Sequence, residues 1–289
     1  MSIKLGIIAS SRGATAPSGT LLLDLYPSAS AAYSFRKLRT AYSGSCIRVR
    51  RSSDNTETDI GFNGGGSIDT TALTTFCGSN NGFVSIWYDQ SGNSQNQIQN
   101  TTGNQPRIVL NGSMILLNTK PSLDTNFFAG QTQFMSTNTA SFNSIQTTII
   151  SVNKSSTLGP AGIYQRLISI GAYNSGYYLG GNSFLDDMLA VFNGSALTCF
   201  GGTINVQNLS ISYNNATTGF LNNNGNQVAT LTTSVSSYGN QKLFIASDSA
   251  NNSAEYWRGN IQEVVVYPSN QSANISGIQT NINSYYTIY

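Results

Sequence analysis

The residues with the clearest capacity for chemistry lie in one basic stretch. Between residues 36 and 51 the chain carries Arg36, Lys37, Arg39, Arg48, Arg50 and Arg51, although only 9% of all its residues are charged. The carboxylates of Asp54, Glu57, Asp59 and Asp89 lie close in sequence. Such arginines could bind an acidic glycan or nucleic acid, or they could pair with these carboxylates through bidentate hydrogen bonds. We favour pairing, and predict a structural network of Arg36, Arg48, Arg50, Arg51, Asp54 and Asp59.

The composition excludes several kinds of site. The net charge of +2 provides no general attraction to nucleic acid or to an anionic membrane. The chain has no histidine, which excludes Ser-His-Asp and Cys-His catalysis and histidine-based zinc sites. Asp54, Glu57 and Asp59 could hold calcium, but they lack the glycine spacing of a known calcium loop, so we expect no metal and no cofactor. The three cysteines, Cys46, Cys77 and Cys199, are interpreted as buried free thiols, and at most one disulfide can form.

A second motif, Trp87-Tyr88-Asp89-Gln90-Ser91-Gly92-Asn93, combines aromatic and hydrogen-bonding residues. Trp87 or Tyr88 could stack on a sugar ring while Asp89 and Gln90 bind its hydroxyls. The alternative, which we favour, is a structural corner in which Asp89 accepts hydrogen bonds from turn amides or from an arginine. Further aromatic candidates for a shallow glycan-binding face are Tyr177, Tyr178 and Trp257, although most aromatic residues of a β protein pack in its core or between subunits.

These residues must be positioned by a β-rich fold. Short runs of β-forming residues alternate with turn clusters, and we predict strands at 83–88, 107–110, 147–152, 166–170, 177–180, 188–192, 206–213, 227–231, 243–246 and 261–267. Helices are predicted within 28–42, over 70–77 with Asp69 or Thr70 as its cap, and over 272–285. This pattern is typical of an all-β sandwich or jelly roll with a few short helices.

The first twenty residues differ from the rest of the chain. A short apolar run is followed by Ser-Arg-Gly-Ala-Thr-Ala-Pro-Ser-Gly, which is typical of a linker. The run is too short for the core of a signal peptide, and no segment is long enough to span a membrane. We expect residues 1–20 to be an edge strand or an arm that docks on a partner. Residues 21–289 should form one domain, made in a cytoplasm although its neutral polar composition is typical of surface proteins.

The two motifs place this chain near a known family. The Arg-rich stretch, Phe76-Cys77 and Tyr88-Asp89-Gln90-Ser91-Gly92 together resemble the catalytic domain of fungal α-L-arabinofuranosidase B. Residues 256–267 resemble the closing strand of concanavalin A-like, laminin-G-like jelly rolls. The resemblance implies a β-sandwich and a retaining mechanism with two carboxylates about 5 Å apart. Asp248 occupies the place of the acid/base, whereas residues 175–180, which match the position of the nucleophile, contain no carboxylate.

We therefore expect a protein without hydrolase activity. Similar domains are frequent in proteins of phages that infect Bacteroidetes, so we predict a virion surface protein: a head fibre, decoration or tail-associated subunit with a lectin-like domain. Residues 1–20 would bind capsid or tail proteins, the protein would form a homo-oligomer, by analogy with fibres a trimer, and its domain could bind glycans. The alternatives are a retaining glycosidase that uses Asp248 with Asp186 or Asp187, and a soluble carbohydrate-binding module.

Overall fold

The fold was analysed in a computed structural model of the chain. It describes residues 21–126, 132–156, 164–171, 176–182, 187–192, 195–198, 205–232, 239–247 and 255–289, with the backbone alone at residues 164, 182, 187–192 and 195–198. The proposed arm at 1–20 therefore lies outside the described residues. No helix in the described part of the chain is long and apolar enough to cross a membrane.

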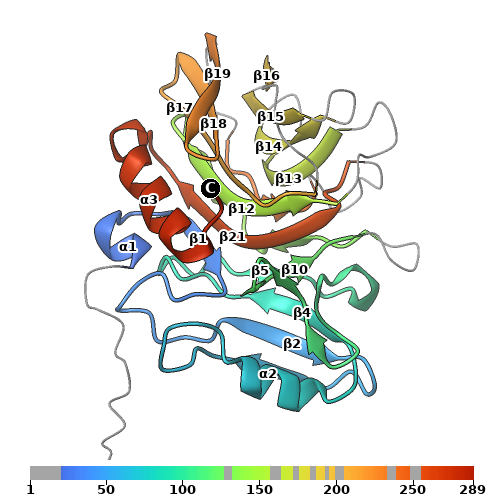
Figure 1. Cartoon of the computed structure of the whole chain (residues 1–289). Coiled ribbons are helices and arrows are strands. Elements are labelled where there is room, and N and C mark those ends of the chain that lie inside the picture. The colour runs from blue at the N-terminus through green and yellow to red at the C-terminus, as the bar shows by residue number, and fades with distance from the viewer. Residues whose placement is uncertain are drawn as a thin grey trace, which may run out of the picture.

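The strands form two packed antiparallel layers (Figure 1). The first layer has the order β19 (Asn226–Thr232), β18 (Thr218–Asn223), β17 (Asn208–Asn214), β12 (Thr148–Ser155) and β21 (Gly259–Tyr267), which pairs also with β1 (Ala31–Ser34) and β10 (Leu123–Asp124). The second layer has the order β16 (Ser195–Thr198), β15 (Asp187–Phe192), β14 (Tyr177–Asn182), β13 (Tyr164–Ile170), β20 (Leu243–Ile245), β11 (Met135–Thr137), β5 (Gln97–Ile98) and β4 (Gly82–Trp87).

Shorter strands complete the fold. β2 (Ile47–Arg51) pairs with β4 on one side and with β3 (Glu57–Ile60) on the other. β6 (Arg107–Leu110) joins β4 to β10 and pairs with β7 (Ser113–Met114). A separate hairpin is formed by β8 (Leu116–Leu117) and β9 (Lys120–Pro121). The predicted all-β jelly-roll class is confirmed, and each of the ten predicted strands overlaps an observed one.

The two central strands are buried on both faces. Side chains that alternate along β12 and β21 point either between the layers, as Ile149 and Val264 do, or to the opposite face, as Ile150 and Val265 do. Helix α3 (Ile275–Tyr286) covers that opposite face with Ile278 and Ile282 (Figure 1). Apolar burial on both sides explains why these strands read as continuous hydrophobic runs.

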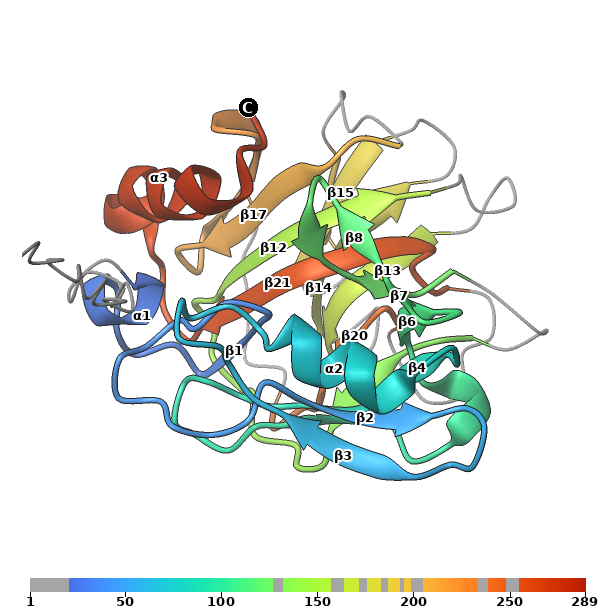
Figure 2. The same cartoon turned by 60° about the horizontal axis from the view of Figure 1, so that its bottom comes forward.

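Two of the three predicted helices are present. Helix α3 follows the short 3-10 helix η2 (Ser272–Asn274), and α2 (Thr70–Cys77) begins after Asp69, whose side chain accepts from the backbone N–H of Ala72. Figure 2 shows α2 lying along β2. The remaining helices are α1 (Leu22–Leu25) and the 3-10 helix η1 (Thr102–Asn104).

The helix predicted within residues 28–42 is wrong. Ala31–Ser34 form β1, and all four residues are buried because β21 binds their backbone and hydrophobic side chains cover both faces. The spacing of Tyr33, Leu38 and Tyr42 resembled a helical repeat, but Tyr33 and Leu38 belong to different hydrophobic clusters. Pairing with a distant strand has therefore overridden the local pattern.

Candidate functional site

The predicted arginine network has an exposed part on β2 and β3. Arg48 binds Asp59 through two hydrogen bonds, of 2.8 and 2.9 Å. Arg51 binds Asp54 in the same way, at 3.1 and 2.6 Å. The hydrogen bonds from Arg48 hold the pKa of Asp59 below its usual value. These pairs lie at the surface, with both side chains of the Arg48–Asp59 pair 39% exposed, and their carboxylates are already engaged.

Arg50 makes a different set of contacts. Its guanidinium donates to the side-chain oxygens of Gln105 and Asn55, at 2.6 and 2.8 Å, and lies 4.9 Å from the centre of the Phe83 ring. Burial lowers the pKa of Arg50. The partners shown for this predicted network member are therefore neutral groups and an aromatic ring.

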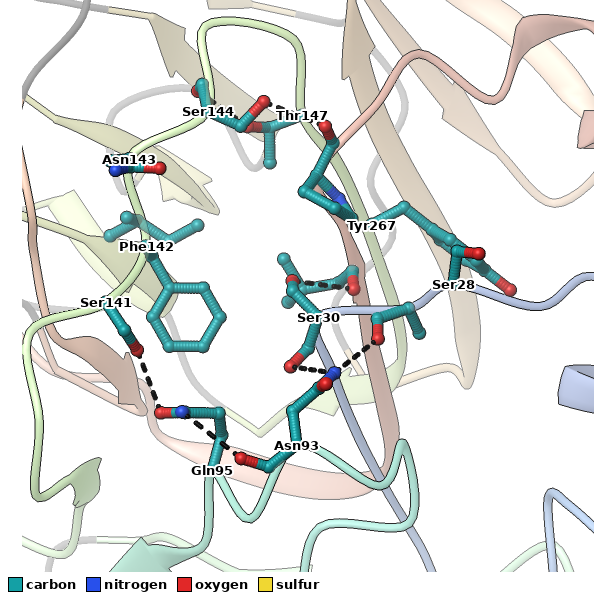
Figure 3. A pocket seen from close by; sticks show the side chains of 14 residues that line it. Ser28, Ser30, Asn93, Gln95, Ser141, Phe142, Asn143, Ser144, Thr147 and Tyr267 are labelled. Carbon is teal, nitrogen blue, oxygen red and sulfur yellow. Dashed lines mark hydrogen bonds between the residues drawn. The ribbon is translucent and has the colours of Figure 1, made fainter. Parts of the chain in front are cut away.

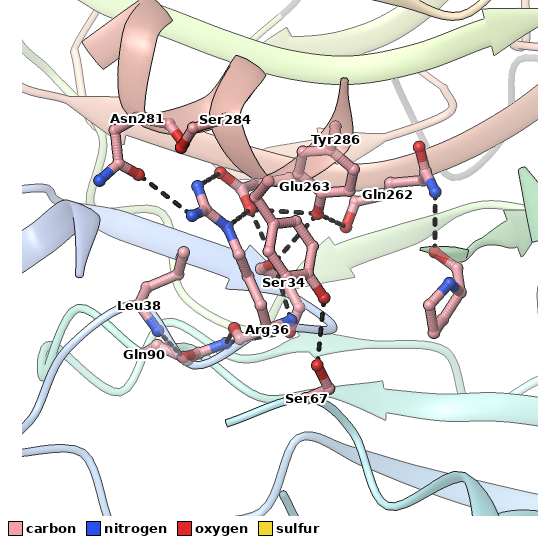
Figure 4. A network of polar contacts seen from close by, with 12 residues as sticks. Ser34, Arg36, Leu38, Ser67, Gln90, Gln262, Glu263, Asn281, Ser284 and Tyr286 are labelled. Carbon is pink, nitrogen blue, oxygen red and sulfur yellow. Dashed lines mark hydrogen bonds and ion pairs between the residues drawn. The ribbon is translucent and has the colours of Figure 1, made fainter. Parts of the chain in front are cut away.

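Arg36 pairs with Glu263 of β21, a partner distant in sequence (Figure 4). The two side chains form hydrogen bonds of 2.8 and 2.9 Å, and Glu263 is fully buried. Ser34 and Tyr286 also donate to this carboxylate, so its oxygens are well satisfied. Burial alone would lower the pKa of Arg36, but the Glu263 carboxylate outweighs it and raises the pKa above its usual value.

The Trp-Tyr-Asp-Gln motif is mostly internal. Trp87 is fully buried and stacks on Phe35, with ring centres 5.0 Å apart, so its faces cannot reach a sugar. Asp89 accepts from the backbone N–H groups of Ala32, Ser91 and Gln95, which is the structural-corner arrangement. Gln90 is likewise buried and binds Leu38.

The remaining aromatic candidates are also poorly placed to bind a ligand. Tyr88 is partly exposed, and its hydroxyl donates to Asp59 at 2.8 Å. Tyr177, Tyr178 and Trp257 are each at most 2% exposed. In this conformation these three rings pack within the fold, because the neighbouring side chains cover them.

The described residues provide no obvious metal centre. Cys46 and Cys77 are buried free thiols, whereas Cys199 lies outside the described residues. Burial raises the pKa of Cys46 and Cys77, which keeps both in the poorly ligating thiol form. No group of three or more Cys, Asp or Glu side chains gathers within the part of the chain that the structure describes.

Carboxylates of the expected catalytic region can be placed only in part. Asp248 and Asp186 lie outside the described residues, and for Asp187 only its place in β15 is given. Glu255, beyond the segment that holds Asp248, accepts two hydrogen bonds from Arg166, at 2.8 and 2.5 Å. The guanidinium of Arg166 also lies 3.5 Å from the centre of the Tyr178 ring. Glu255 is therefore held as the partner of a buried arginine.

A recess with a volume of about 650 Å³ opens among loops at the ends of β1, β4, β12 and β21 (Figure 3). We call it the amide recess, because amide and hydroxyl side chains dominate its wall. They are Ser28, Ser30, Asn93, Gln95, Ser141, Asn143, Ser144 and Thr147. Phe142, which is 6% exposed, and the buried Tyr267 form an apolar part of the wall, and none of the 14 lining residues carries a charge.

Hydrogen bonds hold the wall of the amide recess in place. The Asn93 side chain donates to the carbonyl oxygens of Ala29 and Ser30, at 2.9 and 3.2 Å. Gln95 accepts from the Ser141 hydroxyl at 3.0 Å, which links the β4–β5 loop to the β11–β12 loop. Ser28, also at the rim, has a positive φ of 71°, a conformation that is rare for residues other than glycine. Contacts within the protein therefore fix the shape of the wall.

Sequence reasoning missed the amide recess. Its serines and amides come from separate loops and have no periodicity, so nothing distinguishes them in a chain rich in such residues. One signal was available, because Asn93 ends the Trp-Tyr-Asp-Gln-Ser-Gly-Asn motif. The buried part of that motif braces the loop, and its last residue enters the recess wall.

Comparison with known proteins shows which family the N-terminal part of the chain resembles. Residues 24–114 match the family described as α-L-arabinofuranosidase B, catalytic. The chain is 34% identical over 103 residues to a probable α-L-arabinofuranosidase B of Aspergillus flavus, and 38% identical over 69 residues to α-L-arabinofuranosidase B of Aspergillus niger. These matches cover 35% and 24% of this chain, but only 20% and 14% of the Aspergillus proteins.

The likeness in three dimensions extends over most of the chain. The structure of a GH54 α-L-arabinofuranosidase soaked with a cyclic sulfate inhibitor superposes with a TM-score of 0.64 at 17% identity. A second structure, an arabinofuranosidase complexed with arabinofuranosyl-α-1,2-xylobiose, gives a TM-score of 0.62 at 17% identity. Each match covers 88% of this chain and 62% of the other. The chain thus has an arabinofuranosidase-like, all-β frame.

Proposed function

We propose that this chain is a non-hydrolytic glycan-binding jelly roll, and that the amide recess is its binding site. The observation that carries the proposal is the uncharged, preformed hydrogen-bonding wall on an arabinofuranosidase-like frame. Neutral sugars present hydroxyl groups, which amide and serine side chains can bind as donors and acceptors. The volume of about 650 Å³ lies within the range of small-ligand sites.

The positions and partners of the glutamates support the proposal that the protein does not hydrolyse glycans. A retaining glycosidase needs two carboxyl groups about 5 Å apart. The chain has three glutamates: Glu57 lies in the surface strand β3, while Glu255 and Glu263 each bind an arginine. The amide recess contributes no carboxyl group that could protonate a leaving group. Binding without cleavage therefore agrees best with the described geometry.

The proposal is tested by filling the recess. Ser141 is exposed on its rim, so a Ser141→Trp variant should weaken binding of neutral oligosaccharides on a glycan array, and in titration of the best ligand, at least tenfold. Ser53→Trp is the matched control, because Ser53 is also exposed but lies on the β2–β3 turn. Unchanged binding by Ser141→Trp, or no binding by the parent protein, would refute the assignment.

The setting we propose is the surface of a phage particle, as a head fibre, decoration or tail-associated subunit. The support is compositional: 9% charged residues and an apolar, linker-like segment at residues 1–20. That segment would bind capsid or tail proteins, and the domain, as a homotrimer, would face outward. Deleting residues 1–20 should abolish incorporation into particles while leaving glycan binding intact. Normal incorporation of the deletion variant would rule out the anchoring role.

A second candidate is a retaining glycosidase, which the match at residues 24–114 favours. Asp248 would be the acid/base, with Asp186 or Asp187 as its partner. Release of arabinose from an aryl arabinofuranoside, abolished by Asp248→Asn, would establish this activity and contradict the non-hydrolytic proposal. No release by the parent protein would exclude it.

A further inference from the structure

A second recess, with a volume of about 530 Å³, lies where the described chain begins, beside Leu21. We call it the glycine cleft, because Gly44, Gly61, Gly64 and Gly66 form part of its wall. It shares no lining residue with the amide recess, so a ligand bound there would be independent of the function proposed above.

Local contacts fix the walls of the glycine cleft. The side-chain oxygen of Asn63 accepts from the backbone N–H groups of Gly65 and Ser67, at 2.9 and 3.1 Å, which closes the loop on itself. The Tyr42 hydroxyl, from another segment of the lining, donates to the Ser45 carbonyl at 2.7 Å. The Tyr42 and Phe62 rings meet edge to face, with centres 6.2 Å apart. The cleft thus has a preformed aromatic side and a polar loop.

Lys37 is the one charged residue among those that line the glycine cleft. It is partly buried, and no ion pair is shown for it among the described residues. At the rim, Thr40 donates to the carboxylate of Asp24, at 2.5 Å from its hydroxyl. The sequence of residues 1–20 contains no aspartate or glutamate that could neutralise Lys37. A lysine for which no ion pair is shown, in the wall of a recess, favours an anionic ligand.

We infer that the glycine cleft binds a carboxylated sugar, a uronic acid unit within a glycan. Lys37 would bind the carboxylate, Thr40 and Asn63 would bind hydroxyl groups, and the aromatic pair Tyr42 and Phe62 would contact the apolar side of the ring. One lysine and one aromatic pair in the same cleft suit a sugar ring that carries one carboxylate. Phosphate sites more commonly gather several donors, often from arginines.

The test compares two probes that differ in one carboxylated unit: a xylo-oligosaccharide bearing a glucuronic acid branch and the unbranched oligosaccharide of the same length. Isothermal titration of the full chain should show that the branched probe binds about tenfold more tightly than the unbranched one. One charge-assisted hydrogen bond from Lys37 to the carboxylate accounts for a difference of this size. Raising the salt concentration should reduce this preference.

Two variants test separately the charge of Lys37 and the free volume of the glycine cleft. Lys37→Met should abolish the preference, and Gly61→Trp should do so by filling the cleft, because a Cβ built on Gly61 meets no atom within 4 Å. Ser53→Trp should retain it, since Ser53 lines neither the glycine cleft nor the amide recess. Equal affinity for the two probes, a preference that survives Lys37→Met, or competition by inorganic phosphate as strong as by glucuronate would overturn the inference.

Discussion

At the scale of single residues, the difference between buried and exposed charge explains most of the arginine-rich motif. Arg36 and Glu263 are buried and share Ser34 and Tyr286 as further partners. Arg48 and Asp59 form an equally well-aligned pair in contact with solvent. The two pairs have the same chemistry but should contribute very differently to stability, since losing one partner of a buried pair leaves an uncompensated charge.

Arg36→Met should therefore lower the free energy of unfolding by about 3–5 kcal/mol. The matched change on the surface, Arg48→Met, should cost only about 0–1 kcal/mol. Urea unfolding of both variants, followed by tryptophan fluorescence, measures the difference. Equal losses in the two variants would show that the buried Arg36–Glu263 pair stabilises the fold no more than the surface pair does.

Tyr88 provides a prediction for alkaline pH. Burial, and next the hydrogen bond to Asp59, raise the pKa of Tyr88 to about 12. In the unfolded chain a tyrosine has a pKa of about 10. Because the folded value is the higher one, the contribution of this group is complete below pH 10 and is lost as the pH rises towards 12.

Between pH 9 and pH 11 the parent protein should thus lose stability that the Tyr88→Phe variant does not lose. Urea unfolding at both pH values gives the two differences, and Tyr26→Phe controls for removing a phenol elsewhere. A Tyr88→Phe variant with the same pH dependence as the parent would contradict the assignment.

At the scale of elements, the sequence predicted strands well where hydrophobic residues either alternate along the strand or form a continuous run. The runs at 107–110 and 261–267 are observed as β6 and within β21, and the helix at 70–77 begins after Asp69, one of its two predicted caps. β1 was missed because its burial depends on β21, more than 200 residues later. For the same reason Glu263 could not be predicted as the partner of Arg36.

The pairing of β13 with β14 depends on one glycine. A Cβ added to Gly180 would lie 1.9 Å from the backbone oxygen of Gln165, and a backbone atom cannot move aside easily. Gly180→Ala should therefore lower the free energy of unfolding by about 3 kcal/mol or prevent folding. Gly64→Ala is the control, since a Cβ there meets no atom within 4 Å. Thermal unfolding of the two variants checks this, and similar melting temperatures would contradict the described register.

At the scale of the whole molecule, the fold separates the residues that identify the frame from those proposed to bind ligands. Asp89 and Gln90, which are part of the motif that resembles arabinofuranosidase B, are internal. The amide recess and the glycine cleft are built from loops whose uncharged residues give no signal in the sequence. Sequence reasoning could therefore predict the jelly roll but not the position of either recess, which depends on how distant loops meet.

The central claim is that the amide recess binds a neutral glycan and leaves it intact. The most direct measurement is a crystal structure of the protein soaked with an arabinose-substituted xylo-oligosaccharide. We predict an unbroken sugar bound between Ser141 and Asn93, with hydrogen bonds to amide and hydroxyl side chains. A cleaved product, or a sugar bound beside Asp248 with the amide recess empty, would contradict the account.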